Sequence, residues 1–131
     1  MSAGRLTGRC ECGAVAFEVT GAREAVTACH CSQCRRTSGH VWASTHAPFA
    51  NLTFTEDRGL TWFQSSDWAS RGFCKLCGSS LFYRMKDEEG IGIAAGALDE
   101  PTGLRMGKHI FVRDKGPYYT IADDVPQIET Y

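Results

Sequence analysis

Hydrophobic and polar residues alternate along several short stretches of this chain. The clearest is "AVAFEVTG" at 14–21, where the large apolar side chains fall on every second position from Val15 to Val19. A period of two is typical of a β-strand with one buried face. Similar runs occur at 40–45, 52–55, 60–66, 80–86, 90–98 and 108–114. We therefore predict short strands at these positions.

Turn-forming residues separate the predicted strands, as in "EDRG" at 56–59 and "DEEG" at 87–90. One segment, "SQCRRTSG" at 32–39, is compatible with one or two helical turns that end at Gly39. Strands this short and this evenly spaced favour antiparallel sheets over βαβ units. The sequence therefore predicts a mainly β fold of several small antiparallel sheets.

The composition fits one globular domain that spans residues 1–131. Hydrophobic residues make up 43% and charged residues 22% of the chain, close to the globular average. The net charge is −1 and no basic stripe is present, so we do not expect a nucleic-acid partner.

No segment of the sequence has the pattern of a membrane span or a secretory signal. The weakly apolar stretch "GIGIAAGAL" at 90–98 is interrupted by glycine and is too short to cross a bilayer. The first ten residues lack the apolar centre of a secretory signal. We therefore expect a cytoplasmic protein that does not bind membranes. Nothing in the sequence indicates its oligomeric state.

Seven cysteines gather in three tight clusters, "CEC" at 10–12, "CHCSQC" at 29–34 and "CKLC" at 74–77. Disulfides are rare in the reducing cytosol, and an odd number of cysteines cannot pair completely. C-x-C and C-x-x-C spacings in such a protein indicate metal binding. Inert buried thiols are the alternative, but such thiols have no reason to cluster.

The first and last clusters together offer four thiolates, the ligand number that zinc prefers at a structural site. With a Zn–S distance of ~2.3 Å, sulfurs bound to one ion lie roughly 3.8 Å apart. Residues i and i+2 of a strand point to the same side, so Cys10 and Cys12 can bind one ion. Cys74 and Cys77 form a turn in which Gly78 permits a positive φ. A closed site of this kind would hold two sheets together.

The middle cluster offers three thiolates, from Cys29, Cys31 and Cys34. Cys29 and Cys31 are expected on one face of a strand and Cys34 one turn later, so the three sulfurs can reach one ion. Three protein ligands with an open fourth position are typical of catalytic zinc. Three thiolates on a divalent ion leave a net negative charge, which Arg35 and Arg36 would offset. The fourth ligand would be water or an incoming thiol, which the metal deprotonates.

Two histidines could instead complete this site from within the protein. His30 lies between two of the cysteines, but adjacent residues point to opposite faces of a strand, which makes joint ligation awkward. His109, in "GKHIFV", could reach the site from a remote strand. A different grouping, the C-x-x-C pair of the middle cluster with that of the last, also stays open. Its spacing is longer than usual for a zinc ribbon.

Other residues that could contribute chemistry are tryptophans and acids. Trp42 and Trp62 lie in predicted strands and are expected in the core. Trp68 follows "SSD" in a predicted loop and is the candidate pocket residue. Asp123 and Asp124 are candidates for acid–base work, although a position in a C-terminal turn favours solvation or capping.

Four segments in a fixed order carry a family resemblance: "GRCECGAVAFEV", "CHCSQCRRTSG", "RGFCKLCGSSLFYR" and "KHIFV". They resemble the glutathione-dependent formaldehyde-activating enzyme family, which shares its domain with centromere protein V. The similarity runs from about Gly8 to Pro126. It implies a mainly β fold of several coiled sheets, the β-tent type, with two zinc ions per chain.

The resemblance also implies roles for individual residues. By position, the structural zinc site comprises Cys10, Cys12, Cys74 and Cys77, and the catalytic site comprises Cys29, Cys31 and Cys34. The family is classed among carbon–sulfur lyases, and its named activity joins formaldehyde to glutathione as S-hydroxymethylglutathione. The implied substrates are therefore a glutathione-like thiol and a small aldehyde.

Candidate substrate-binding residues are Arg35, Arg36, His109 and Trp68. The arginines could meet the carboxylates of glutathione, as could Arg71, Lys108 and Arg113. His109 matches the histidine of the family motif and would act as a pocket residue or as a hydrogen-bonding support.

Two other functions remain open on the same scaffold. One is a binding module in which zinc is only structural. The other is a redox sensor that uses the middle cluster as an oxidisable set of thiols, since cysteines of low pKa near arginine are readily oxidised.

Overall fold

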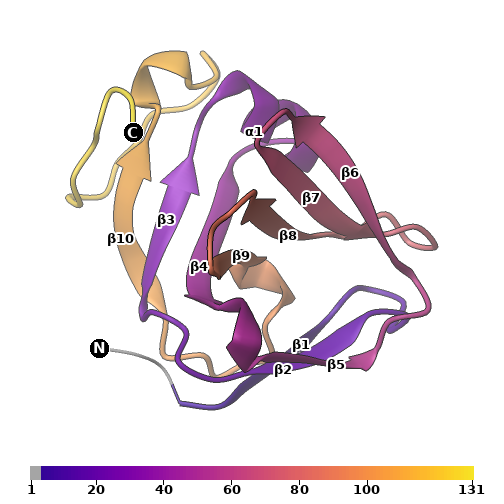
Figure 1. Ribbon diagram of the computed structural model, residues 1–131. Coiled ribbons are helices and arrows are strands. Elements are labelled where there is room, and N and C mark those ends of the chain that lie inside the picture. The colour runs from indigo at the N-terminus through magenta and orange to yellow at the C-terminus, as the bar shows by residue number, and fades with distance from the viewer. Residues whose placement is uncertain (1–3) are drawn as a thin grey trace.

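The computed structural model describes residues 4–131, so residues 1–3 of the predicted domain lie outside the described part. Its strands form two sheets. One has three strands in the order β1-β2-β5, and the other has seven in the order β10-β3-β4-β9-β8-β7-β6 (Figure 1). The fold is mainly β, as the sequence predicts.

Within residues 4–131 the strands are β1 (Leu6–Arg9), β2 (Ala16–Val19), β3 (Ala25–Cys29), β4 (Trp42–Pro48), β5 (Leu52–Glu56), β6 (Leu60–Ser66), β7 (Ala69–Cys74), β8 (Ser80–Met85), β9 (Gly90–Ala94) and β10 (Arg105–Ile110). The helical elements are α1 (Ser32–Ser38) and the 3-10 turns η1 (Phe49–Asn51), η2 (Ala95–Ala97) and η3 (Val112–Asp114).

Each of the seven predicted runs overlaps an observed strand, and three further strands, β1, β3 and β7, lie outside them. These three have the sequences "LTGR", "AVTAC" and "ASRGFC". Small residues and threonine contribute little hydrophobic contrast, so alternation does not reveal such strands. The predicted helix is confirmed: α1 ends at Gly39, which has φ 89° and donates its N–H to the Arg35 carbonyl at 2.8 Å.

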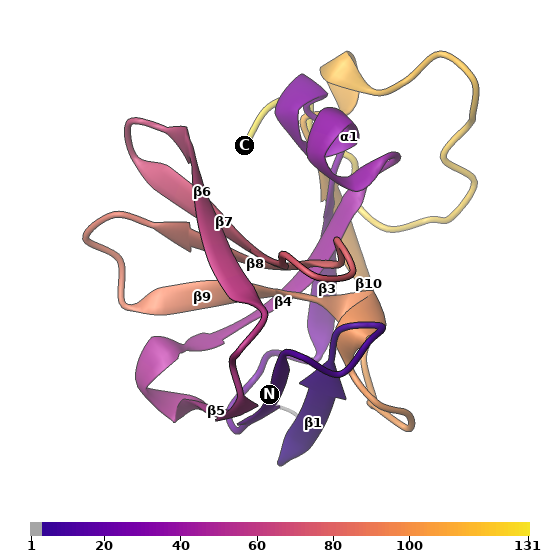
Figure 2. The same cartoon turned by 90° about the vertical axis from the view of Figure 1, so that its right-hand side faces the viewer.

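The expectation of purely antiparallel sheets is wrong for one pair of strands. β10 pairs with β3 in parallel, with His109 opposite Ala28 and Ile110 opposite Cys29; the two arrows point the same way in Figure 1, and Figure 2 shows this part of the sheet behind β4. Most of the chain lies between these two strands, so the parallel pairing needs no local crossover helix. The local alternation of hydrophobic and polar residues cannot predict a pairing between strands so far apart in the sequence.

Phe82 on β8 lies where the two sheets pack together. It is 1% exposed, and its ring makes edge contacts with Phe17 of β2 at 5.2 Å and Phe54 of β5 at 5.6 Å between centroids. Trp62 of β6 stacks on it at 6.1 Å. Trp42 is buried as expected, but Trp62 is 38% exposed, since it covers Phe82 from the solvent side.

Among residues 4–131, no helix has both the length and the hydropathy that a membrane crossing requires.

Replacing Phe82 with Ala should lower the free energy of unfolding by about 3–5 kcal/mol, because it removes a buried ring that three aromatic side chains contact. Urea denaturation of the purified protein measures this loss. Met85→Ala on the same strand is the control, because Met85 is 41% exposed and should cost about 1 kcal/mol or less. Equal losses in the two variants would contradict the central place given to Phe82.

Candidate metal centres and their surroundings

One group of four cysteines lies between the two sheets. Cys10 directly follows β1 of the three-stranded sheet, and Cys74 ends β7 of the seven-stranded sheet. The sulfurs of Cys10, Cys12, Cys74 and Cys77 all lie within 4.8 Å of one another. The Cys10–Cys12 and Cys12–Cys74 sulfur distances are both 3.8 Å, which matches the separation of roughly 3.8 Å at a tetrahedral zinc–thiolate site.

Two tight turns bring these sulfurs together. The N–H of Gly13 donates to the Cys10 carbonyl at 3.3 Å, and that of Gly78 donates to the Cys74 carbonyl at 2.7 Å. Both glycines have φ 82°, a conformation that disfavours side chains. The expected extended strand through Cys10 and Cys12 is wrong, because β1 ends at Arg9 and the pair lies in the turn.

The environment of this group lowers the pKa of Cys10 and Cys77, which favours their thiolates, whereas the neighbouring cysteines raise the pKa of Cys12. Hydrogen bonds from the Ser79 hydroxyl, at 3.2 Å, and from the Ser79 backbone lower the pKa of Cys77 to about 5. The Val15 N–H donates to the Cys10 sulfur at 3.2 Å. Metal ligation requires deprotonated cysteines, so these donors suit a cation site.

The second group comprises Cys29, Cys31 and Cys34, whose sulfurs also lie within 4.8 Å of one another. Cys29 ends β3, Cys31 is the N-cap of α1, and Cys34 lies in the first turn of that helix. The expectation that Cys29 and Cys31 share a strand face is therefore wrong. The strand ends at Cys29, and the start of the helix turns Cys31 toward it.

Negative charge in this group concentrates on Cys31. Hydrogen bonds from the Cys29 and Cys34 thiols, with the Cys34 N–H at 3.3 Å, lower the pKa of Cys31 to about 2. Donating to Cys31 raises the pKa of Cys29. A cation that displaces the shared protons would allow all three sulfurs to be thiolates at once. The donor set therefore fits a divalent metal that prefers sulfur.

Arg71 on β7 supplies positive charge beside the three sulfurs. One of its guanidinium nitrogens, Nη2, donates to the Cys34 sulfur at 3.4 Å and to Gln33 at 3.1 Å. The Arg71 guanidinium lies 4.8 Å above the Tyr83 ring, and the residue is only 8% exposed. Its position beside Cys34 depends on the pairing of distant strands. From the sequence alone, Arg71 is therefore only one of several candidate cations.

A chain of hydrogen bonds passes beside the three-cysteine group and engages both nearby histidines. Tyr119 bonds to His30 Nδ1, His30 Nε2 lies 2.9 Å from His109 Nδ1, and His109 Nε2 lies 2.9 Å from Asp123. A single direction of donation, from the Tyr119 hydroxyl through both rings to the Asp123 carboxylate, satisfies every atom with neutral imidazoles. Burial lowers the pKa of His30, which agrees with a neutral ring.

These hydrogen bonds determine whether either histidine can serve as a further ligand beside the three sulfurs. His30 is 1% exposed and His109 is 6% exposed, and all four ring nitrogens have partners. Within residues 4–131, no histidine or acid joins the three sulfurs as a potential ligand. Cys31 and Cys34 also lie in a different group from Cys74 and Cys77, so the alternative pairing of the two C-x-x-C motifs is not adopted.

The candidate substrate residues lie on different elements of the fold. Arg35 is half-buried, with an Nε that has no hydrogen-bond partner, and Arg36 is exposed. Trp68 is 59% exposed between β6 and β7. His109 acts as a link in the hydrogen-bond chain, which agrees with a supporting role. The sequence did not predict that Tyr119 and His30 are hydrogen-bonded to each other, because this contact depends on the approach of the C-terminal segment to β3.

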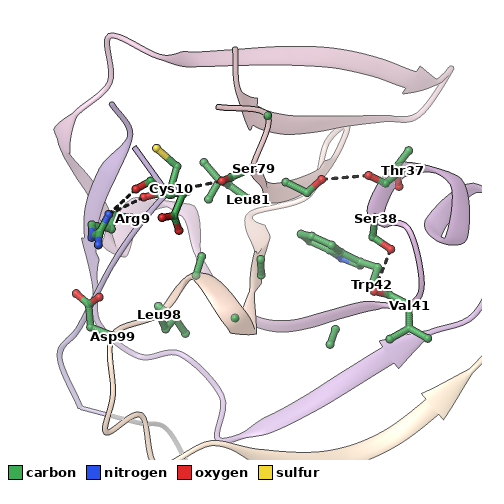
Figure 3. Close-up of a pocket in the computed structure, with 17 residues that line it drawn as sticks. Arg9, Cys10, Thr37, Ser38, Val41, Trp42, Ser79, Leu81, Leu98 and Asp99 are labelled. Carbon is green, nitrogen blue, oxygen red and sulfur yellow. Dashed lines mark hydrogen bonds between the residues drawn. The ribbon is translucent and has the colours of Figure 1, made fainter. Parts of the chain in front are cut away.

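Two neighbouring cavities lie near the cysteine groups. The larger, about 630 Å³, extends from Arg9 and Asp99 at one end to Thr37, Ser38 and Trp42 at the other (Figure 3). The smaller, about 310 Å³, shares four lining residues with it: Thr37, Trp42, Gly78 and Ser80. Neither cavity is lined by Arg35, Arg36, Trp68 or His109.

Comparison with known proteins gives three findings. The sequence model of a family described as glutathione-dependent formaldehyde-activating enzyme matches residues 5–114. A Schizosaccharomyces pombe protein named as an uncharacterized lyase is 30% identical over 82 residues, which cover 58% of this chain and 55% of that protein. The match thus spans about half the length of this curated relative. The crystal structure of a Rhodobacter sphaeroides protein, a structural genomics target, is similar with a TM-score of 0.61 and 25% identity, covering 92% of this chain and 98% of that one.

Replacing His109 with Ala should lower the free energy of unfolding by about 1–3 kcal/mol, because it leaves the buried Nε2 of His30 without a partner. Thermal or urea denaturation gives the value. His40→Ala serves as control, because His40 is exposed and its bond to Tyr118 should contribute about 0.5 kcal/mol or less. A loss at His109 no larger than that at His40 would argue against a continuous hydrogen-bond chain.

Proposed function

The chain belongs to the glutathione-dependent formaldehyde-activating enzyme family, and from this premise we propose that it is a zinc-dependent carbon–sulfur lyase. Its reaction would form or cleave the adduct of a glutathione-like thiol with formaldehyde or another small aldehyde. The observation that carries the proposal is the three-cysteine group, whose sulfurs converge without a fourth ligand from the described residues. The lyase name of the yeast relative supports the reaction class.

Two zinc ions would be bound, one in each cysteine group. The four-cysteine group would be a closed structural site that joins the two sheets and holds a β-tent-type arrangement, in a single domain. Cys29, Cys31 and Cys34 would hold the catalytic ion. When bound there, zinc supplies an open position at which an incoming thiol loses its proton.

Residues of the chain would prepare this site for the thiol. Arg71 donates to the Cys34 sulfur and so would offset the negative charge that three or four thiolates produce. Arg35 and Arg36 follow Cys34 on α1 and would attract the carboxylates of a glutathione-like thiol. His109 would support the site indirectly, because its hydrogen bond fixes the ring of His30, the residue between Cys29 and Cys31. Trp68 would cover the site from the turn between β6 and β7.

Purified wild-type protein should contain about two zinc ions per chain, and Cys31→Ser should retain about one, because serine is a poor zinc ligand. The wild type should also accelerate S-hydroxymethylglutathione formation, followed by exchange NMR, and the variant should not. Ser32→Ala, at an exposed neighbouring position, is the control and should keep both properties. Two zinc ions in Cys31→Ser would contradict the assignment of the ligands. Two zinc ions without turnover in the wild type would favour the binding module.

Arg71→Gln should weaken zinc binding at the three-cysteine group by about 10–100-fold, because it removes the positive charge beside the Cys34 sulfur. Competition with a chromophoric chelator measures the affinity of the weaker site. Arg84→Gln is a matched control on the adjacent strand, since the Arg84 guanidinium lies 3.7 Å above the Phe49 ring. Unchanged affinity in Arg71→Gln would show that the guanidinium does not support the metal.

A further inference from the structure

The smaller cavity has an aromatic lining and a volume of about 310 Å³. Its walls include Trp42, Phe63, Phe73 and Phe82. A cavity of roughly 150 Å³ lined by apolar side chains suffices to bind benzene, so this one has room for a six-membered ring with several further atoms. A single-carbon substrate such as formaldehyde would leave most of it unfilled.

This cavity is linked to the three-cysteine group through residues that line the one and contact the other, although none of the three cysteines lines it. Arg71 lines it and also donates to the Cys34 sulfur at 3.4 Å. Trp42 lines it and packs in the same buried cluster as Cys29 and Cys34. Thr37 lines it from the helix that carries Cys34. A molecule held among the aromatic rings would therefore contact Arg71 and Trp42, the residues that lie against the cysteines.

The cavity is mainly apolar; Arg71 is the one charged residue of its lining, and Thr37 and Ser80 add hydroxyl groups. Arg71 is 8% exposed, and in residues 4–131 no carboxylate lies within ion-pair distance of it. Its buried Nε has no hydrogen-bond partner. A buried guanidinium with unused hydrogen-bonding capacity favours a ligand that brings an electron-rich oxygen.

Resting on the function proposed above, we propose that this cavity binds the carbon body of the aldehyde, and that this body is aromatic or a bulky alkyl group. The oxygen-bearing end of the molecule would lie toward Arg71 and the three sulfurs. The cavity would then determine which aldehyde the enzyme prefers.

The reaction of such an aldehyde balances without a further reactant besides water. The thiolate sulfur forms a bond to the carbonyl carbon, and the π electron pair of the C=O bond moves to oxygen. The resulting oxyanion takes a proton from water and gives a hemithioacetal, and the hydroxide that remains is neutralised by the proton that the thiol released when it became a thiolate. Arg71 would stabilise the developing negative charge on oxygen, since preorganised donors in a low-dielectric site favour charge that develops in the transition state.

Binding of 2-phenylethanol tests the cavity without any turnover. This unreactive alcohol carries a ring and an oxygen at the spacing of phenylacetaldehyde. Titration of zinc-loaded protein, followed by NMR, should give saturable binding that Phe63→Ala weakens about tenfold. Phe63 is 56% exposed, so its loss should spare the core, and Met85→Ala, which lies outside the lining, should bind normally. Absence of binding, or equal affinity in Phe63→Ala and wild type, would overturn the proposal.

Kinetics separate this proposal from the proposed function. With glutathione as the thiol, Phe63→Ala should lower kcat/KM for phenylacetaldehyde about tenfold and leave kcat/KM for formaldehyde nearly unchanged. Equal losses for both aldehydes would refute a role of the cavity in selectivity. If the wild type accelerates neither reaction but binds 2-phenylethanol as described, the lyase proposal fails and the cavity stands as a binding site for apolar alcohols or aldehydes.

Discussion

Close packing of cysteine sulfurs is the constraint on which this structure depends. Two groups, one of four cysteines and one of three, hold their sulfurs within 4.8 Å of one another. Thiolates at that distance repel each other, so they must share protons or surround a cation. In the four-cysteine group the sulfurs come from turns after β1 and β7, which belong to different sheets. The shared protons or the cation that neutralise these sulfurs therefore also determine how firmly the two sheets are joined.

The three-cysteine group differs because, among residues 4–131, its surroundings supply charge and not a fourth ligand. The histidines nearest in sequence and space, His30 and His109, are committed to a buried hydrogen-bond chain that ends at Asp123. Arg71 donates to the Cys34 sulfur from the other side and also lines an aromatic cavity. This arrangement suits a metal site with an exchangeable ligand beside a place for an apolar molecule.

Spacing in the sequence was sufficient to predict the two cysteine groups, the helix at Cys34 and most strands, because these depend on local turns and alternation. Local pattern did not predict the parallel pairing of β10 with β3, which brings His109 to His30. It also did not indicate the burial of Arg71, because its contact with Cys34 requires β7 and α1 to meet. The aromatic cavity likewise combines residues of several strands, none of which is distinctive alone.

The most direct test of the account is zinc K-edge X-ray absorption on protein loaded with two zinc ions, before and after addition of glutathione. Seven cysteines shared by two ions predict an average of about 3.5 sulfur ligands per zinc at ~2.3 Å, rising to about 4 when an external thiol fills the open position. An average that does not change on adding thiol, or a histidine shell in the spectrum of the free protein, would contradict an open three-sulfur site.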